Sequence, residues 1–110
     1  MNRLVITPLA ASDIEEIGDY IAQDNPSRAV SFMAELRMQC RKIAAAPQAY
    51  RLRPELGDGI RSCAHGNYVI FFCASDDEVS IVRVLHGARD IGAQFGGCLL
   101  YTSDAADERG

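Results

Sequence analysis

Five residues between positions 61 and 89 carry side chains suited to chemistry on a phosphodiester. Arg61 and Arg83 could together stabilise a pentacoordinate phosphate, and His86 could act as a general base, with Tyr68 and Arg89 in the same stretch. Such a set works only when its members share one surface. Arg83 and His86 are three residues apart in one expected strand, which places them on opposite faces. The sequence therefore predicts an acid/base set that is poorly assembled.

A second group of residues has zinc-binding side chains: Cys63, His65, Cys73 and His86. Zinc sites in proteins are built from closely spaced ligand pairs, and this group contains none. With Cys40, three cysteines precede residue 98, an odd number without Cys-x-x-Cys spacing. This pattern indicates reduced thiols in a cytosol and not a disulfide framework. We expect no metal and no cofactor.

The C-terminal residues do not read like the rest of the chain. Residues 98–108 read Cys-Leu-Leu-Tyr-Thr-Ser-Asp-Ala-Ala-Asp-Glu, which resembles the in-frame translation of a transposon-type sequencing-library adapter at every position. A frayed polar tail is the alternative interpretation. We predict one domain over residues 1–97 and an artefactual tail over residues 98–110. Without the tail, 10 basic and 12 acidic residues remain, and the net charge changes from −4 to −2.

Length and charge exclude several classes of protein. A chain of 110 residues forms one domain, and no apolar run approaches the roughly 18 residues that span a bilayer. The start of the chain lacks the basic and apolar regions of a secretion signal. The net charge is negative and Lys42 is the single lysine. This composition argues against binding that rests on neutralising phosphates, and against direct sequence-specific recognition of nucleic acid.

The first half of the chain predicts a strand and two helices. Residues 2–6 alternate as a strand, and Thr7-Pro8 provides an N-cap followed by a first helical residue. Asn25-Pro26 repeats this start signal, and Pro47 ends the second helix. Because the connection is so short, the helices must form an antiparallel hairpin. The expected apolar stripes are Leu9, Ile14, Ile17 and Ile21 in the first helix, and Ala29, Phe32 or Met33, Leu36, Cys40 and Ile43 in the second.

The second half predicts a loop and three strands. The loop covers residues 48–59, and the strands cover residues 60–65, 68–73 and 78–86. Gly66-Asn67 forms a two-residue hairpin turn, in which glycine supplies a positive φ. The fold class is α+β: an N-terminal strand and an antiparallel helical hairpin packed on a small, mainly antiparallel sheet, in the order β-α-α-β-β-β.

The hairpin turn decides which strand residues share a face. It pairs His65 with Tyr68, Cys63 with Ile70 and Arg61 with Phe72, all on one face. The other face is smaller and less charged, so we expect it to pack on the helices; it contains Ile60, Ser62, Ala64, Val69, Phe71 and Cys73. A four-residue turn over residues 74–77 then places Arg83 opposite Tyr68 on the open face. A three-residue turn would bury Arg83 without a partner, which is costly.

Several motifs carry a resemblance to a known family. They include Thr7-Pro8-Leu9-Ala10 and Arg53-Pro54-Glu55-Leu56-Gly57, and above all Gly66-Asn67-Tyr68-Val69-Ile70-Phe71-Phe72 and Ile81-Val82-Arg83-Val84-Leu85-His86-Gly87-Ala88-Arg89-Asp90. Over nearly all of residues 2–95 the chain resembles RelE/ParE-family toxins of bacterial type II toxin–antitoxin systems, and most of all the ParE branch. The resemblance implies the same α+β fold. It also implies a cytoplasmic toxin that a ParD-like antitoxin silences in a hetero-oligomer.

The two branches of this family imply different targets. ParE-branch toxins are associated with poisoning DNA gyrase, whereas RelE-branch toxins cut mRNA in the ribosome. The negative charge, the poorly assembled acid/base set and the resemblance to the ParE branch favour gyrase, or another protein target, over RNA cleavage. The expected target-binding residues are Arg89, Asp90 and Phe95, because they leave the sheet after its last strand. A ribosome-dependent mRNA endonuclease that uses Arg61, Tyr68, Arg83 and His86 stays open, as does a degenerate toxin that retains antitoxin binding alone.

Overall fold

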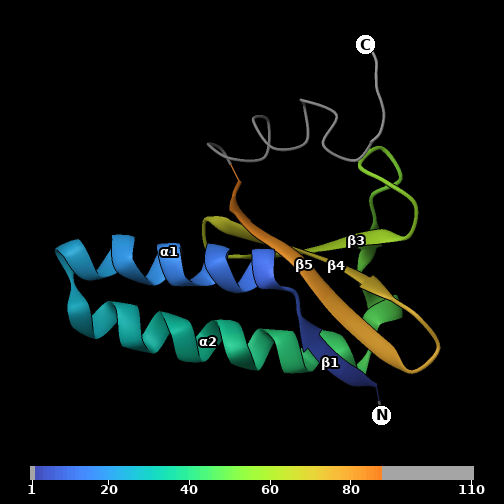
Figure 1. The fold of residues 1–110 in the computed structure, drawn as a ribbon, viewed down its shortest axis with the longest axis horizontal. Helices are drawn as coiled ribbons and strands as arrows, with labels where there is room; N and C mark the ends of the chain where they lie inside the picture. The colour runs from blue at the N-terminus through green and yellow to red at the C-terminus, as the bar shows by residue number, and fades with distance from the viewer. Residues whose placement is uncertain (1, 88–110) are drawn as a thin grey trace.

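A helical hairpin packs against a five-stranded sheet in the computed structural model, which describes residues 2–87 (Figure 1). The elements follow one another as β1 (Arg3–Ile6), α1 (Pro8–Asp24), α2 (Pro26–Ala45), the 3-10 turn η1 (Pro47–Ala49), β2 (Arg51–Leu52), β3 (Ile60–His65), β4 (Tyr68–Ala74) and β5 (Glu78–His86). The strand order is β1-β5-β4-β3-β2, with β1 parallel to β5 and the other pairs antiparallel. The predicted fold class is confirmed. The segment expected to be a loop also contains η1 and β2.

Both helices begin where the sequence predicts. The Thr7 side chain accepts a hydrogen bond from the Ala10 N–H at 3.2 Å, and the Asn25 side chain accepts one from the Arg28 N–H at 3.1 Å. Asn25 alone separates α1 from α2, so the two helices fold back on each other. The buried stripe of α1 differs from expectation at one end, because Leu9 is 53% exposed and Ala10 is buried instead.

The sheet presents to the helices the face that the sequence analysis assigned to solvent. Tyr68, Ile70 and Phe72 are buried in one core with residues of α1 and α2, whereas Phe71 and Ile60 belong to a second, smaller cluster. The expected assignment is therefore wrong. The charged residues do not keep this face in solvent, because Arg61 and His65 make polar contacts at the edge of the helix-facing side. The face that carries Tyr68, Ile70 and Phe72 packs against the helices, because burying its larger aromatic surface removes more apolar area from water.

The pairing of β3 with β4 is as predicted, but the pairing of β4 with β5 has another register. The hairpin joins His65 to Tyr68 and Arg61 to Phe72, and Gly66 has a φ of 60° in its turn. The turn before β5 does not cover residues 74–77 as expected, because the strands already pair at Ala74 and Val79, which moves the register by two positions. An irregularity between Phe71 and Phe72 of β4 moves it by one more, so His86 and not Arg83 lies opposite Tyr68. Arg83 lies opposite Phe71. The irregularity leaves Val82 without a partner in the pairing of β4 with β5, as a β-bulge does, and so breaks the alternation of faces there.

Candidate functional site

Arg83 is held by a carboxylate on the first helix. Its Nε and Nη2 atoms donate to Oδ2 and Oδ1 of Asp13 at 2.8 and 2.9 Å, and the Val84 N–H also donates to Oδ2 at 3.0 Å. Both charged side chains are only 11% exposed. The expectation that burial would leave Arg83 without a partner is therefore wrong, because Asp13 supplies one. β5 pairs with β1 only as far as Ile81. The ion pair connects α1 to the part of β5 that follows this residue.

The other nuclease candidates are separated into two places. Tyr68 is buried, and its ring meets that of His86 edge-on with centroids 5.4 Å apart. Arg61 donates to the Tyr50 carbonyl oxygen at 2.7 Å, near the opposite end of β3. The structure therefore brings Tyr68 and His86 together, while Arg61 and Arg83 are each bound to other groups. The strand is regular from Arg83 to His86, so these two residues lie on opposite faces as predicted. His86 shares a face with Tyr68, and it is Arg83 that is separated from Tyr68, contrary to expectation.

The expected target-binding residues, Arg89, Asp90 and Phe95, lie outside the described residues 2–87. What the structure does describe is the strand that leads to them. β5 ends at His86, and the Gly87 N–H donates to the Asn67 carbonyl oxygen at 2.8 Å. The end of β5 is thereby fixed against the β3–β4 turn.

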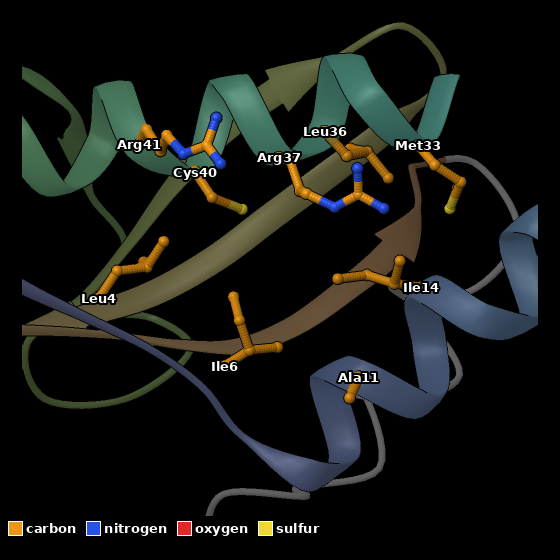
Figure 2. A pocket seen from close by; sticks show the side chains of 9 residues that line it. All are labelled: Leu4, Ile6, Ala11, Ile14, Met33, Leu36, Arg37, Cys40 and Arg41. Atoms are coloured by element: carbon orange, nitrogen blue, oxygen red, sulfur yellow. The ribbon is translucent and has the colours of Figure 1, made fainter. Parts of the chain in front are cut away.

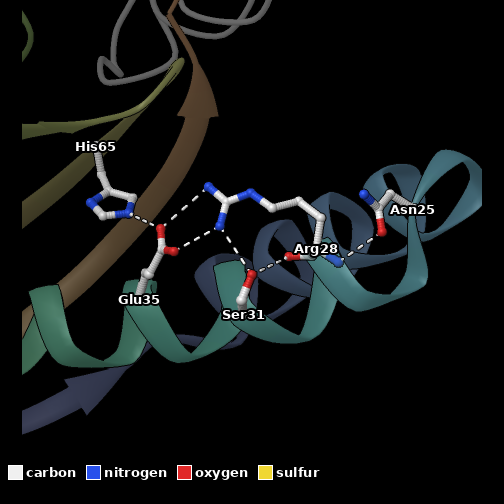
Figure 3. A network of polar contacts seen from close by, with 5 residues as sticks. All are labelled: Asn25, Arg28, Ser31, Glu35 and His65. Carbon is white, nitrogen blue, oxygen red and sulfur yellow. Dashed lines mark hydrogen bonds and ion pairs between the residues drawn. The ribbon is translucent and has the colours of Figure 1, made fainter.

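A polar network on α2 was not anticipated from the sequence. Arg28 donates to both carboxylate oxygens of Glu35 at 2.7 and 3.4 Å, and to the Ser31 hydroxyl at 3.0 Å (Figure 3). His65 Nε2 lies 3.2 Å from the same carboxylate and connects the network to β3. The Arg28 hydrogen bond, followed by that of His65, holds the pKa of Glu35 below its usual range. The seven-residue spacing of Arg28 and Glu35 on one helix face was the available signal.

The three cysteines within the described residues are free thiols. Burial, together with the nearby Cys63, raises the pKa of the Cys40 thiol to about 11. Burial also raises the pKa of Cys63 and Cys73. A protonated thiol is a poor nucleophile and a poor metal ligand. Among residues 2–87, no group of three or more His, Cys, Asp or Glu side chains is placed to hold a metal ion.

An apolar pocket of about 390 Å³ opens between β1, α1 and α2 (Figure 2). Its apolar lining comes from all three elements, and Figure 2 shows Arg37 projecting from α2 toward the α1 side of the space. The lining residues are Leu4, Ile6, Ala11, Ile14, Met33, Leu36, Arg37, Cys40 and Arg41. An apolar pocket with basic groups beside it suits an apolar side chain that is flanked by carboxylates.

No helix within residues 2–87 is long and apolar enough to cross a membrane.

Comparison with known proteins identifies the family. The family described as "ParE toxin of type II toxin-antitoxin system, parDE" matches residues 4–91. Toxin ParE1 of Caulobacter vibrioides is 31% identical over 88 residues, which are 79% of this chain and 91% of that protein.

Two solved structures have the same fold. A chain of the chromosomal ParDE system from P. aeruginosa gives a TM-score of 0.68 at 21% identity, over 78% of this chain and 96% of that one. A chain of the RelBE2 toxin–antitoxin complex from Mycobacterium tuberculosis gives 0.58 at 23% identity, over 77% and 96%. The fold is therefore shared by ParDE and RelBE proteins, while the sequence match is to ParE. The chain belongs to the ParE toxin family of type II toxin–antitoxin systems.

Proposed function

We propose that this toxin inhibits growth by poisoning DNA gyrase and that a ParD-like antitoxin neutralises it in the cytoplasm. The observation that carries the proposal is the match to ParE over residues 4–91, together with the 31% identity to Toxin ParE1. A toxin that acts on a protein target needs a shaped surface and no acid/base cluster. The negative net charge and the separated arginines are compatible with such a role.

A second candidate, ribosome-dependent mRNA cleavage, rests on one contact. The rings of Tyr68 and His86 are in contact near the ends of β4 and β5, so a phenol and an imidazole lie side by side, with the tyrosine buried. Cleavage of RNA also needs a cation for the phosphate. Arg61 and Arg83 already bind the Tyr50 carbonyl and the Asp13 carboxylate, so recruiting either would break an existing interaction. This cost favours the gyrase proposal.

The apolar pocket between β1, α1 and α2 is the proposed groove for the antitoxin. Within residues 2–87, β1 is an edge strand that pairs with β5, so a partner can approach both the strand edge and the pocket. Amphipathic segments bind such surfaces as a helix in a groove or as an added strand. Co-purification with the product of the adjacent small reading frame tests this. The absence of a complex at micromolar concentration would contradict the assignment of a partner.

Induced expression in a bacterium without antitoxin tests the toxic activity. We expect loss of growth, and we expect Arg89→Glu to abolish it while antitoxin binding persists. Arg61→Ala and His86→Gln should leave toxicity intact. Arg83→Ala is a poor test, because it also leaves Asp13 buried without its partner. Cleaved mRNA together with loss of toxicity in Arg61→Ala or His86→Gln would support the nuclease, and normal growth with folded protein would support a degenerate toxin.

A further inference from the structure

β5 loses one of its two neighbouring strands before it ends. β1 pairs with β5 from Glu78 to Ile81, and the chain then turns into α1, where the Thr7 N–H donates to the Ile81 carbonyl oxygen at 3.1 Å. Beyond Ile81, β4 is the one strand within residues 2–87 that pairs with β5. A strand with a single neighbour leaves the backbone N–H and C=O groups of its other edge without a strand partner.

Side chains of α1 and of its N-cap take the place of the missing strand. The Thr7 hydroxyl donates to the Val82 carbonyl oxygen at 3.4 Å, and Asp13 Oδ2 accepts a hydrogen bond from the Val84 N–H at 3.0 Å. Val82 is the residue that has no partner in β4. The part of β5 where the register shifts is therefore held by α1 and its cap.

Asp13 constrains the orientation of β5 as well as its distance from α1. Its two carboxylate oxygens accept hydrogen bonds from Nε and Nη2 of Arg83 at 2.8 and 2.9 Å, and Oδ2 also accepts the one from Val84. Apolar side chains commonly fill the place of a buried ion pair with equal or greater stability. They do not supply direction, whereas a carboxylate that binds a guanidinium through two oxygens fixes an angle.

The chain leaves the sheet just after this contact. The Gly87 N–H donates to the Asn67 carbonyl oxygen at 2.8 Å, so the last residues of β5 lie between two fixed points, Asp13 on α1 and Asn67 in the β3–β4 turn. The expected target-binding residues begin at Arg89, two positions after Gly87. A binding site works only when the surrounding elements hold its residues in the right geometry.

We propose that Asp13 is a positioning residue for target binding. Through Arg83 and Val84 it sets the direction in which β5 leaves the sheet, and thereby the place where the segment that begins at Arg89 meets the target. This inference rests on the proposed function, because it takes gyrase as the target and Arg89 as a contact. Asp13 is not itself a contact residue, since its side chain is 11% exposed and is bound to β5.

Two variants of the full chain separate orientation from stability. Asp13→Leu together with Arg83→Met removes both charges and leaves neither unpaired, so the fold is kept while the directed contacts are lost. Ile43→Ala is the control, because it removes core packing and leaves the Asp13 contacts in place. Ile43 is next to Ala44, which accepts a hydrogen bond from Asn2 at the end of the sheet where β1 and β5 begin.

The measurement is the toxin concentration that halves DNA supercoiling by gyrase, at a temperature where thermal unfolding shows each variant to be folded. The double variant should require at least about tenfold more toxin than the wild type, and Ile43→Ala less than about twofold more. Asp13→Asn is a further variant for the case that the double variant does not fold. Its amide keeps one acceptor oxygen for the β5 backbone but cannot bind Arg83 through two oxygens, so it should require about three- to tenfold more toxin.

Three results would contradict the inference. A folded double variant that inhibits gyrase as well as the wild type overturns the positioning role, and so does Asp13→Asn with wild-type inhibition if the double variant does not fold. Equal losses of inhibition in the double variant and in Ile43→Ala also overturn it, because inhibition then follows stability alone. A wild-type toxin that leaves gyrase active contradicts the proposed function, and the inference falls with it.

Discussion

At the scale of single residues, the Asp13–Arg83 pair shows what sequence reasoning misses. The two residues are 70 positions apart, and no spacing pattern in the sequence links them. The sequence indicated Arg83 as a residue able to do chemistry, and the structure holds its guanidinium against Asp13 with 11% of each side chain exposed. A buried guanidinium is tolerated when a carboxylate binds it through two hydrogen bonds. The same carboxylate also satisfies the Val84 N–H.

Asp13→Ala tests this structural role. We expect the free energy of unfolding to fall by about 3–5 kcal/mol, because Arg83 stays largely buried without its partner. Asp19→Ala is the control, since Asp19 is exposed on the same helix, and it should change stability by less than about 0.5 kcal/mol. Urea denaturation measures both. Equal effects of the two substitutions would show that the pair contributes nothing to the fold.

The Cys40 thiol provides a prediction about pH. Its pKa is about 11 in the folded protein against an ordinary value of 9.0, so the folded state holds this proton more tightly than the unfolded state. The stabilising contribution is complete below pH 9 and is lost as the pH rises toward 11. Cys40→Ala should therefore lessen the loss of stability between pH 9 and 11. An unchanged alkaline profile in this variant would exclude Cys40 as a cause.

At the scale of elements, the sequence predicts those features that local chemistry decides. Thr7 and Asn25 cap the helices and Gly66 forms the turn, each through contacts within three residues. The choice between the two faces of the sheet was wrong, because Phe71 and Phe72 are adjacent and both faces are apolar. Alternation along a strand separates two faces, but it does not say which one the helices cover. The bulge in β5 had no local signal.

Gly66 gives the prediction at this scale. Its φ of 60° is left-handed, and a Cβ added there would lie 3.7 Å from Phe32, an ordinary contact. Gly66→Ala should therefore destabilise the protein by about 1–2 kcal/mol through the backbone and not through a clash. Gly66→Asn should cost less, since asparagine tolerates this conformation better. Denaturant titration of the wild type and the two variants measures their free energies of unfolding. An alanine variant as stable as wild type would contradict the turn geometry.

At the scale of the whole molecule, the domain boundary is the first prediction. We expect the folded domain of this chain to lie within residues 1–97, because residues 98–108 resemble a translated adapter. A chain that ends at Gly97 should then keep its free energy of unfolding within about 1 kcal/mol of the full chain. Thermal and denaturant unfolding of the two chains measure this. A larger loss would mean that residues 98–110 pack on the domain.

The direct test of the account is a gyrase assay with purified toxin. ParE membership is established by sequence, but the ParDE and RelBE structures share the fold, so the fold alone does not select the target. We predict that the toxin inhibits DNA supercoiling by gyrase and accumulates cleaved gyrase–DNA complexes, while ribosome-bound mRNA stays intact. Full supercoiling activity in the presence of a folded, growth-inhibiting toxin, together with cleavage of the mRNA, would contradict the account.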